Sequence, residues 1–298
     1  MTLQKLKSTD AFVVVDLDGA ETSTGIVRWA KRILVDGATN LARVTTYTYA
    51  SFGIPRGGAS AGVSAPPEGR EAALAAFVEE LGPQVAAGAL RLAPGKGVDA
   101  SDFAAWGDAA LPPAGESTAE ALAAGVVAAA AAASGGSLAG VTVAVEDIGP
   151  ATASIVSAFT HAGAEVSTAD GDVTTAEVDV LAIGSKAGVL HHEAVPGLRC
   201  KLVVPTGPIP ITARALAHGR QHGIVVLPDF VTAAGPTLLA DPTVAPGDGS
   251  VAAAATAIAE VITEVLDHEH GPLLGACLRA EENLRTWHPT LPFGRPIA

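Results

Sequence analysis

The candidate chemistry of this chain depends on cationic and hydroxyl side chains in glycine-rich turns. Arg56 precedes the pair Gly57-Gly58 and lies four residues before Ser60. A guanidinium presents a planar fork of donors that can hold a carboxylate through two hydrogen bonds. Lys96 lies in a second such turn, Pro94-Gly95-Lys96-Gly97, which can direct its side chain into a cleft. These residues predict a site for a carboxylate or dianionic ligand, with Lys96 and Ser60 as candidate catalytic groups.

A second candidate site is the turn at residues 147–152, between an expected strand and an expected helix. A dinucleotide-binding turn at this place needs three glycines, which let the pyrophosphate approach the helix N-terminus closely. Only Gly149 is present, and Asp147 follows Glu146, so two carboxylates stand near the expected pyrophosphate. Alternatively, Asp147 caps the helix that follows. Asp170, after the next strand, is the candidate ribose ligand, and it also fits an ordinary turn.

Composition and charge exclude several classes of protein. The chain has 298 residues, a formal net charge of −13 and a pI near 4.9. Because this charge repels nucleic acid and anionic membranes, we expect neither as a partner. Residues 134–137 divide the uncharged stretch 121–145, and neither part approaches the ~20 apolar residues of a membrane helix. The histidines lack metal-ligand spacing, and two cysteines make no disulfide framework. We therefore expect a cytoplasmic protein without a metal.

The rest of the sequence predicts the elements that position these side chains. In the first half, apolar patterns predict strands at 11–17 and 90–93. They predict helices at 29–43, 68–81 and 117–133. In the second half, helices alternate with short apolar strands at 141–145, 164–168, 178–183, 202–204 and 224–227. Such alternation is typical of a parallel, doubly wound sheet. We predict an α/β fold with domains at 1–134 and 135–270, followed by a segment at 271–298.

Several segments resemble motifs of one enzyme family, in the same order along the chain. The most informative is 47–63, which resembles the signature of the glutamate/leucine/phenylalanine/valine dehydrogenases. Leucine dehydrogenases are the most similar members. The other matching segments are 24–29, 36–50, 88–103, 187–195 and 223–235.

This resemblance implies a fold, a reaction and a set of site residues. The family has an N-terminal α/β domain for substrate binding and oligomerisation, a C-terminal Rossmann-like doubly wound domain, and a last helix that returns to the first domain. Its members deaminate α-amino acids with NAD or NADP in the cleft between the domains. The implied substrate-binding residues are Tyr47, Thr48, Arg56, Gly57 and Gly58. The implied cofactor-binding residues are Gly149, Asp147 and Asp170.

The residues at the family's catalytic positions differ in type from the family pattern. Thr48 and Ser60 stand where the family has two lysines, and Gly95 stands at the position of the aspartate. A hydroxyl cannot supply the cation that holds a substrate carboxylate, and glycine cannot move a proton. Arg28 matches an arginine that is usual in the family, whereas Ala233 replaces an asparagine on the nicotinamide side.

Three interpretations follow from this pattern. The first, which we favour, is a repurposed or non-catalytic member that binds a small anionic metabolite in the interdomain cleft. The second is an NAD(P)-dependent oxidoreductase or imine-forming enzyme that acts on an amino or keto acid through relocated groups such as Lys96. The third is a structural or regulatory subunit. We expect a homo-oligomer, or an assembly with a paralogous subunit, and weak binding of the nicotinamide cofactor that the resemblance implies.

Overall fold

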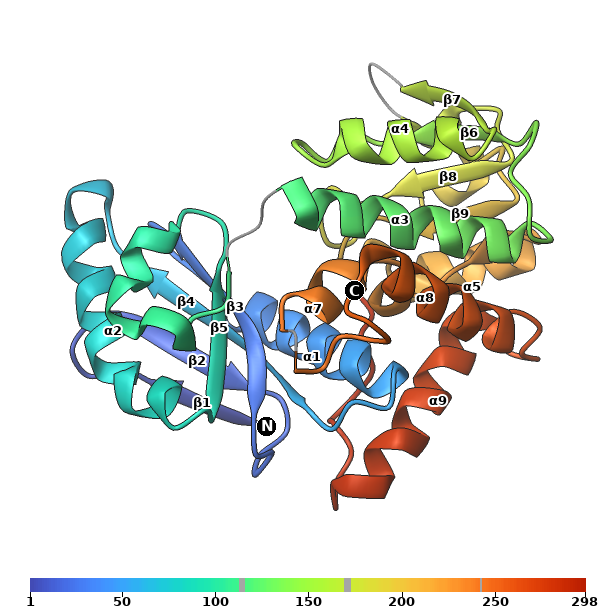
Figure 1. Cartoon of the computed structure of the whole chain (residues 1–298). Helices are drawn as coiled ribbons and strands as arrows, with labels where there is room; N and C mark the ends of the chain where they lie inside the picture. The colour runs from blue at the N-terminus through green and yellow to red at the C-terminus, as the bar shows by residue number, and fades with distance from the viewer. Residues whose placement is uncertain (113–115, 169–172, 242) are drawn as a thin grey trace. The chain divides into compact units, whose positions relative to one another are not determined.

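The structure is a computed structural model that describes residues 1–112, 116–168, 173–241 and 243–298. Contacts between Cα atoms divide the chain into two compact units (Figure 1). The first unit comprises residues 1–114 and 281–295, and the second comprises residues 115–280 and 296–298. Both units combine a sheet with helices, which confirms the predicted α/β class.

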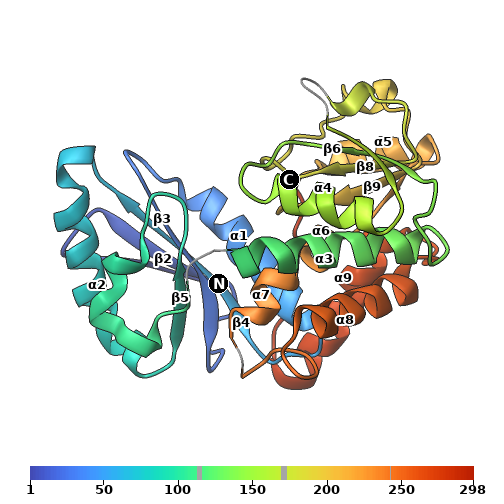
Figure 2. The same cartoon turned by 45° about the horizontal axis from the view of Figure 1, so that its top comes forward.

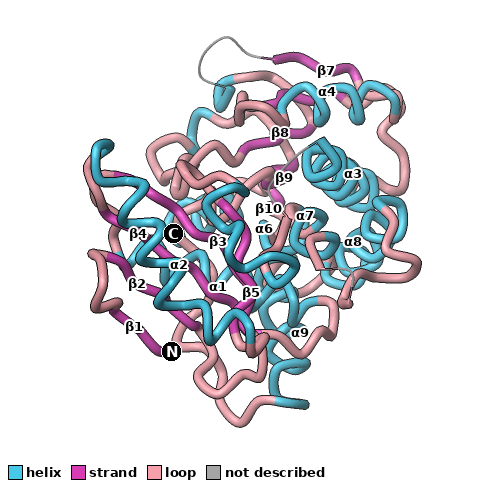
Figure 3. The backbone as a smooth tube through the Cα atoms, turned by 60° about the vertical axis from the view of Figure 1, so that its left-hand side comes forward, coloured by secondary structure: helices cyan, strands magenta, loops and turns pink. Residues whose placement is uncertain are grey.

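The first unit contains a five-stranded mixed sheet (Figure 3). Its strand order is β1 (Thr2–Lys5), β2 (Ala11–Val15), β4 (Gly57–Ser64), β3 (Ser23–Ala30) and β5 (Leu90–Pro94). Strand β3 runs parallel to both β4 and β5, whereas β2 is antiparallel to β1 and β4. The predicted helix at 29–43 was wrong at its start, because Trp29 and Ala30 still pair with β4 and α1 begins only at Val35.

Two helices cover opposite faces of this sheet. Helix α1 (Val35–Ser51) packs Ala38 and Ala42 against Phe12 and Val14 of β2. The 3₁₀ turn η1 (Pro67–Gly69) leads into helix α2 (Arg70–Ala86). Helix α2 and the 3₁₀ segment η2 (Ala100–Ala109) pack against the other face of the sheet, which carries the strand residues that alternate with those facing α1. Alternation along each strand directs one set of side chains to each helix.

The second unit contains a five-stranded sheet in which every pairing is parallel. Its order is β10 (Val225–Val226), β9 (Leu202–Pro205), β8 (Val180–Ile183), β6 (Thr142–Val145) and β7 (Glu165–Thr168). The chain runs from β6 outward to β7 and then returns to β8 on the other side of β6. Ligands of doubly wound sheets bind beyond the carboxyl ends of the strands at such a reversal, so the loops after β6 and β8 are the expected ligand-binding position in this unit.

The helices of the second unit include the Ala-rich segment that we expected in the first domain. Helix α3 (Glu116–Ala133) packs alongside α4 (Thr152–His161) and α8 (Val251–Val265), as Figure 2 shows, and against α7 (Gly235–Leu239). The division between the units therefore precedes α3, whereas we expected it after residue 134. The other helical segments are η3 (Val173–Thr175), η4 (Val195–Gly197), α5 (Ala213–Gln221) and α6 (Asp229–Thr232).

Helix α9 (Pro272–Trp287) begins in the second unit and continues into the first, in which residues 281–295 lie. Those residues are held there by hydrogen bonds from Asn283 Nδ2 to the Ala50 carbonyl, at 3.0 Å, and from Tyr47 to Glu281. Among the described residues, no helix is long and apolar enough to span a lipid bilayer.

Candidate functional site

One face of the first-unit sheet carries the side chains that are best suited to bind a ligand. In the ladder between β3 and β4, Ile26 pairs with Ser60 and Arg28 pairs with Gly62. Paired residues point to the same face, and so do residues two apart on one strand. Arg28 and Ser60 therefore share a face, the one that β2 and β4 present to α1. Ile26 lies on it too and is exposed to solvent, so α1 leaves the β3 side of this face open.

Arg28 and Ser60 carry hydrogen-bonding atoms on this face that are buried without a protein partner. Ser60 is fully buried, and its Oγ makes no hydrogen bond. Arg28 is half-buried, and its Nε and Nη2 are both buried without an acceptor. Desolvation lowers the pKa of the Arg28 guanidinium from its ordinary value. Since native proteins normally pair such groups, and all three atoms can donate, the arrangement suits an acceptor-rich, anionic ligand.

Gly95, at the position of the family's aspartate, lies beside Arg28. A Cβ atom on Gly95 would be 2.8 Å from the Val27 carbonyl oxygen and 3.3 Å from Arg28 Cγ. The first distance is shorter than a carbon atom can tolerate, and a backbone oxygen cannot move aside as a side chain can. The backbone of β3 and the stem of Arg28 therefore exclude any side chain, acidic or not, at position 95.

Arg56 and the backbone of Lys96 contact opposite ends of β3. Arg56 Nη1 lies 3.5 Å from Thr24 Oγ1, near the start of β3. The carbonyl of Lys96 accepts a hydrogen bond from Trp29 N near the end of β3, and its side chain is exposed. Five residues of strand separate the two contacts, roughly 16 Å at 3.3 Å per residue. That both cations hold one ligand stays a prediction, whereas the strand register places Arg28 on the same sheet face as Ser60.

Thr48, Tyr47 and the two glycines have packing roles in this unit. Thr48 is buried in α1, and the Tyr47 hydroxyl lies 3.2 Å from Glu281 Oε1. The Gly58 amide donates to Thr46 Oγ1 at 2.9 Å, and the Gly57 amide donates to the Thr22 carbonyl at 3.0 Å. A Cβ atom on Gly58 would be 1.9 Å from the Ala42 carbonyl oxygen, so glycine lets α1 approach β4. Neither glycine amide is available to a ligand.

In the second unit, side chains of the chain itself fill the turn after β6. Asp147 Oδ1 accepts hydrogen bonds from Gly149 N and Thr152 Oγ1, both at 2.9 Å. Thr152 Oγ1 in turn accepts from Ile148 N at 2.9 Å. The hydrogen bond from the Gly149 amide, and after it that from the Thr152 hydroxyl, lowers the pKa of Asp147. Asp147 does not cap α4, because its carboxylate closes the turn before the helix. A phosphate bound at this turn would need the same amide groups.

Glu146 occupies the position where the chain reverses between β6 and β8. Its Oε2 accepts from Gly184 N at 2.8 Å and from Ser185 N at 2.9 Å, and its Oε1 accepts from Ser185 Oγ at 2.6 Å. Its carboxylate thus links the loops that follow the two strands. The carboxylates of Glu146 and Asp147 accept hydrogen bonds from backbone amides in both loops, and their charge repels a pyrophosphate. The third candidate of this site, Asp170, lies outside the described residues.

Asp229, which we had noted only as part of a matching segment, is an unusual buried acid. It is 3% exposed, and its Oδ2 accepts from Ile209 N at 2.6 Å. Ile209 is the one non-glycine residue with positive φ among those described, at 44°. Burial raises the pKa of Asp229 to about 6, against the opposing effect of its backbone hydrogen bonds. Through its hydrogen bond from Ile209 N, the Asp229 side chain holds a strained loop at the carboxyl end of the sheet.

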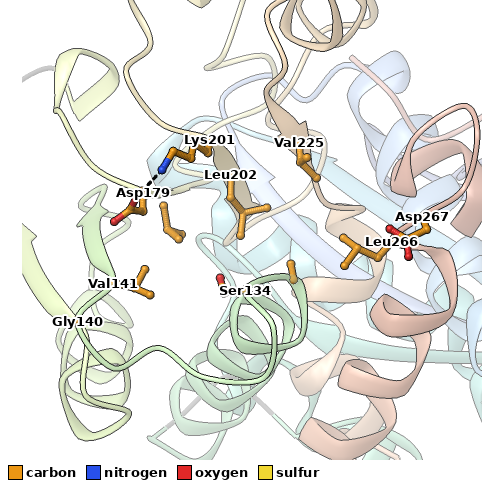
Figure 4. A pocket seen from close by; sticks show the side chains of 11 residues that line it. Ser134, Gly140, Val141, Asp179, Lys201, Leu202, Val225, Leu266 and Asp267 are labelled. Atoms are coloured by element: carbon orange, nitrogen blue, oxygen red, sulfur yellow. Dashed lines mark hydrogen bonds and ion pairs between the residues drawn. The ribbon is translucent and has the colours of Figure 1, made fainter.

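A pocket in the second unit lies at the opposite edge of the sheet (Figure 4). Apolar side chains at the amino ends of the strands line it, among them Val141, Val180, Leu202 and Val225. On its rim, Asp179 pairs with Lys201 at 3.2 Å and accepts hydrogen bonds from Thr142, which lower its pKa. Because these polar groups bind one another, and because doubly wound sheets bind ligands at the other edge, we do not place the functional site here.

Comparisons with known proteins identify the fold. No protein-family model matches the sequence, and no curated protein matches it. Solved structures do match. The L-tryptophan dehydrogenase from Nostoc punctiforme has a TM-score of 0.74 at 17% identity, over 96% of both chains. The leucine-bound, hetero-hexameric glutamate dehydrogenase from Thermus thermophilus has a TM-score of 0.74 at 20% identity, over 95% of this chain and 86% of that one.

Another glutamate dehydrogenase gives a TM-score of 0.77 at 15% identity, over 94% of this chain and 82% of that one. Proteins of one enzyme class thus match almost the whole chain. The chain has the fold of the amino-acid dehydrogenases, as the motifs at 47–63 and 223–235 predicted.

Proposed function

We propose that this chain binds a small anionic metabolite in its first unit, and that it has lost the nicotinamide-dependent deamination of amino acids. The observation that carries the proposal is the set of three buried, unpartnered donors on one sheet face, Arg28 Nε, Arg28 Nη2 and Ser60 Oγ. A buried donor without an acceptor costs free energy. An anion at this position would satisfy all three donors and compensate the guanidinium charge.

The loss of the dehydrogenase reaction is supported by both units. The lysine positions hold Thr48 and Ser60, and position 95 has no room for the aspartate. In the second unit, Glu146 and Asp147 use the amide groups that a pyrophosphate would need. Removal of a single acid or base group typically lowers a rate by ~10² to 10⁴. We therefore expect no deamination of leucine, valine, phenylalanine or glutamate with either NAD or NADP.

The test of the binding proposal is calorimetric titration of the full chain with glutarate, succinate and sulfate. We expect at least one of these anions to bind, and Arg28→Gln to weaken that binding by about tenfold or more, since hydrogen bonds to charged groups contribute ~1.5 to 3 kcal/mol. The matched control is Arg32→Gln, which removes an exposed arginine just beyond β3 and leaves the affinity unchanged. Equal affinities in parent and Arg28→Gln contradict the proposal.

The fold supports a second candidate, an oxidoreductase or imine-forming enzyme that uses relocated groups such as Lys96. This candidate predicts a change in the absorbance of a nicotinamide cofactor when the protein is mixed with amino or keto acids. A third candidate, a structural or regulatory subunit, is favoured by the hetero-hexameric neighbour. It predicts co-purification with a paralogous chain, whereas a homo-oligomer would give a single chain by mass spectrometry and a multiple of the protomer mass by light scattering.

A further inference from the structure

We propose that the site at Arg28 and Ser60 selects anions that carry no α-ammonium group, and so discriminates against amino acids. This inference rests on the proposed function and names its ligand class: a carboxylate, a dicarboxylate or an inorganic dianion.

The strands that build the site contain no counter-charge for an ammonium group. Strands β3, β4 and β5 have no Asp or Glu in their sequences. The β5 ladder pairs Arg91 with Thr24, so a second arginine lies on the same face as Arg28. An amino acid brings a cation together with its carboxylate, and a desolvated cation needs acceptors or an opposite charge. This face offers the carboxylate its donors, but it offers the ammonium group two guanidinium groups.

Several acidic residues elsewhere in the first unit have cationic partners. Asp16 Oδ1 binds Arg43 Nε at 2.8 Å on the α1 side of the sheet, whereas its Oδ2 is buried without a hydrogen-bond partner. Asp99 and Asp102 bind Arg70 at 3.2 and 2.5 Å, and Glu281 binds Arg295 at 2.6 Å. The negative charge of each of these carboxylates is thus already balanced by an arginine.

The position that would serve an amine is closed by packing. The family's aspartate position is Gly95, where a Cβ atom would be 2.8 Å from the Val27 carbonyl oxygen. Arg28 Cγ lies on the other side of the same space, 3.3 Å from that Cβ position. The backbone of β3 and the Arg28 stem therefore leave no room for an acid at position 95, and the charged side chain beside this position is that of Arg28.

Matched ligand pairs test this inference on the unmodified protein. Succinate and L-aspartate differ only in the α-ammonium group, and so do glutarate and L-glutamate, and 4-methylpentanoate and L-leucine. We expect calorimetry to show, in every pair with measurable binding, that the ammonium-free member binds at least about tenfold tighter, which is 1.4 kcal/mol. Binding of sulfate with no binding of any amino acid would support the same conclusion.

The outcomes separate this inference from the function beneath it. If an amino acid binds as tightly as its ammonium-free partner, the selectivity is wrong while anion binding stands. If no ligand of the panel binds, sulfate included, the proposed function itself fails. Arg28→Gln should reduce the preference within a pair as well as the affinity, because it removes the positive charge that repels the ammonium group. The exposed control Arg32→Gln should preserve the preference.

Discussion

Replacing Arg28 by methionine should stabilise the protein when no anion is present. Arg28 Nε and Nη2 are buried without acceptors, and each such donor costs ~1 to 3 kcal/mol. Since the residue as a whole is only half-buried, the lower part of this range applies. Methionine retains the apolar stem beside Gly95 and removes both donors. The expected gain in the free energy of unfolding is therefore ~2 kcal/mol, at a position where most substitutions would destabilise.

Urea denaturation in an anion-poor buffer measures this gain, with Arg32→Met as the matched control. An exposed substitution of that kind should stay within ~0.5 kcal/mol of the parent. Sulfate at roughly 100 times its Kd should then stabilise the parent by ~2.7 kcal/mol through binding, beyond the general salt effect seen in Arg28→Met. If Arg28→Met instead loses more than ~1 kcal/mol in the anion-poor buffer, the guanidinium has stabilising partners and the reasoning is refuted.

Three further predictions concern the other unusual residues. Asp229 has a pKa of about 6 in place of 3.8, so the folded state binds its proton more tightly than the unfolded state, and the parent protein loses stability as pH rises from about 4 to 6. In denaturation curves, the stability of Asp229→Asn relative to the parent should therefore increase by ~3 kcal/mol between these two pH values. A stability difference that does not change with pH would contradict this. Calorimetry should give a Kd for NADH above ~1 mM for the parent. The double variant Glu146→Gln, Asp147→Gly should bind NADH at least tenfold more tightly. Micromolar binding of NADH by the parent would contradict the proposed obstruction of this turn by carboxylates. Gly95→Asp should destabilise by ~2 kcal/mol through overpacking without restoring deamination, an idea that neutral stability would contradict.

Much of the second unit could be predicted from its sequence, because its inner strands β6, β8 and β9 are short apolar runs with buried side chains on both faces. Val143–Val145 and Val180–Ile183, for example, are buried throughout, and such runs stand out locally between polar loops. Strand β3 is different. Its side chains follow no simple apolar pattern, because the polar residues Thr24 and Arg28 and the exposed Ile26 interrupt the buried apolar ones. Its partner strands lie about 30 and 60 residues further along the chain. Its pairing is not a local property, so we placed a helix over its last residues.

The residues of the candidate site could be predicted only in part, because their proximity also depends on strand pairing. Ser60 could be named because the segment around it resembles a known signature. Its proximity to Arg28 follows from the register between β3 and β4, and that register is set by tertiary packing. The closure of position 95 likewise depends on the backbone of β3. For Glu146 and Asp147, sequence reasoning identified the charge conflict with a pyrophosphate, but not the amide groups of Gly184 and Ser185 that Glu146 occupies.

The most direct test of anion binding at Arg28 and Ser60 is a crystal structure of the protein grown with selenate, whose position anomalous diffraction reveals. We predict selenate oxygens at hydrogen-bond distance, about 2.7 to 3.2 Å, from Arg28 Nη2 and Ser60 Oγ. We expect no selenate at the turn of Asp147. Selenate at that turn but not at Arg28, or protein acceptors bound to both Arg28 donors, would contradict it.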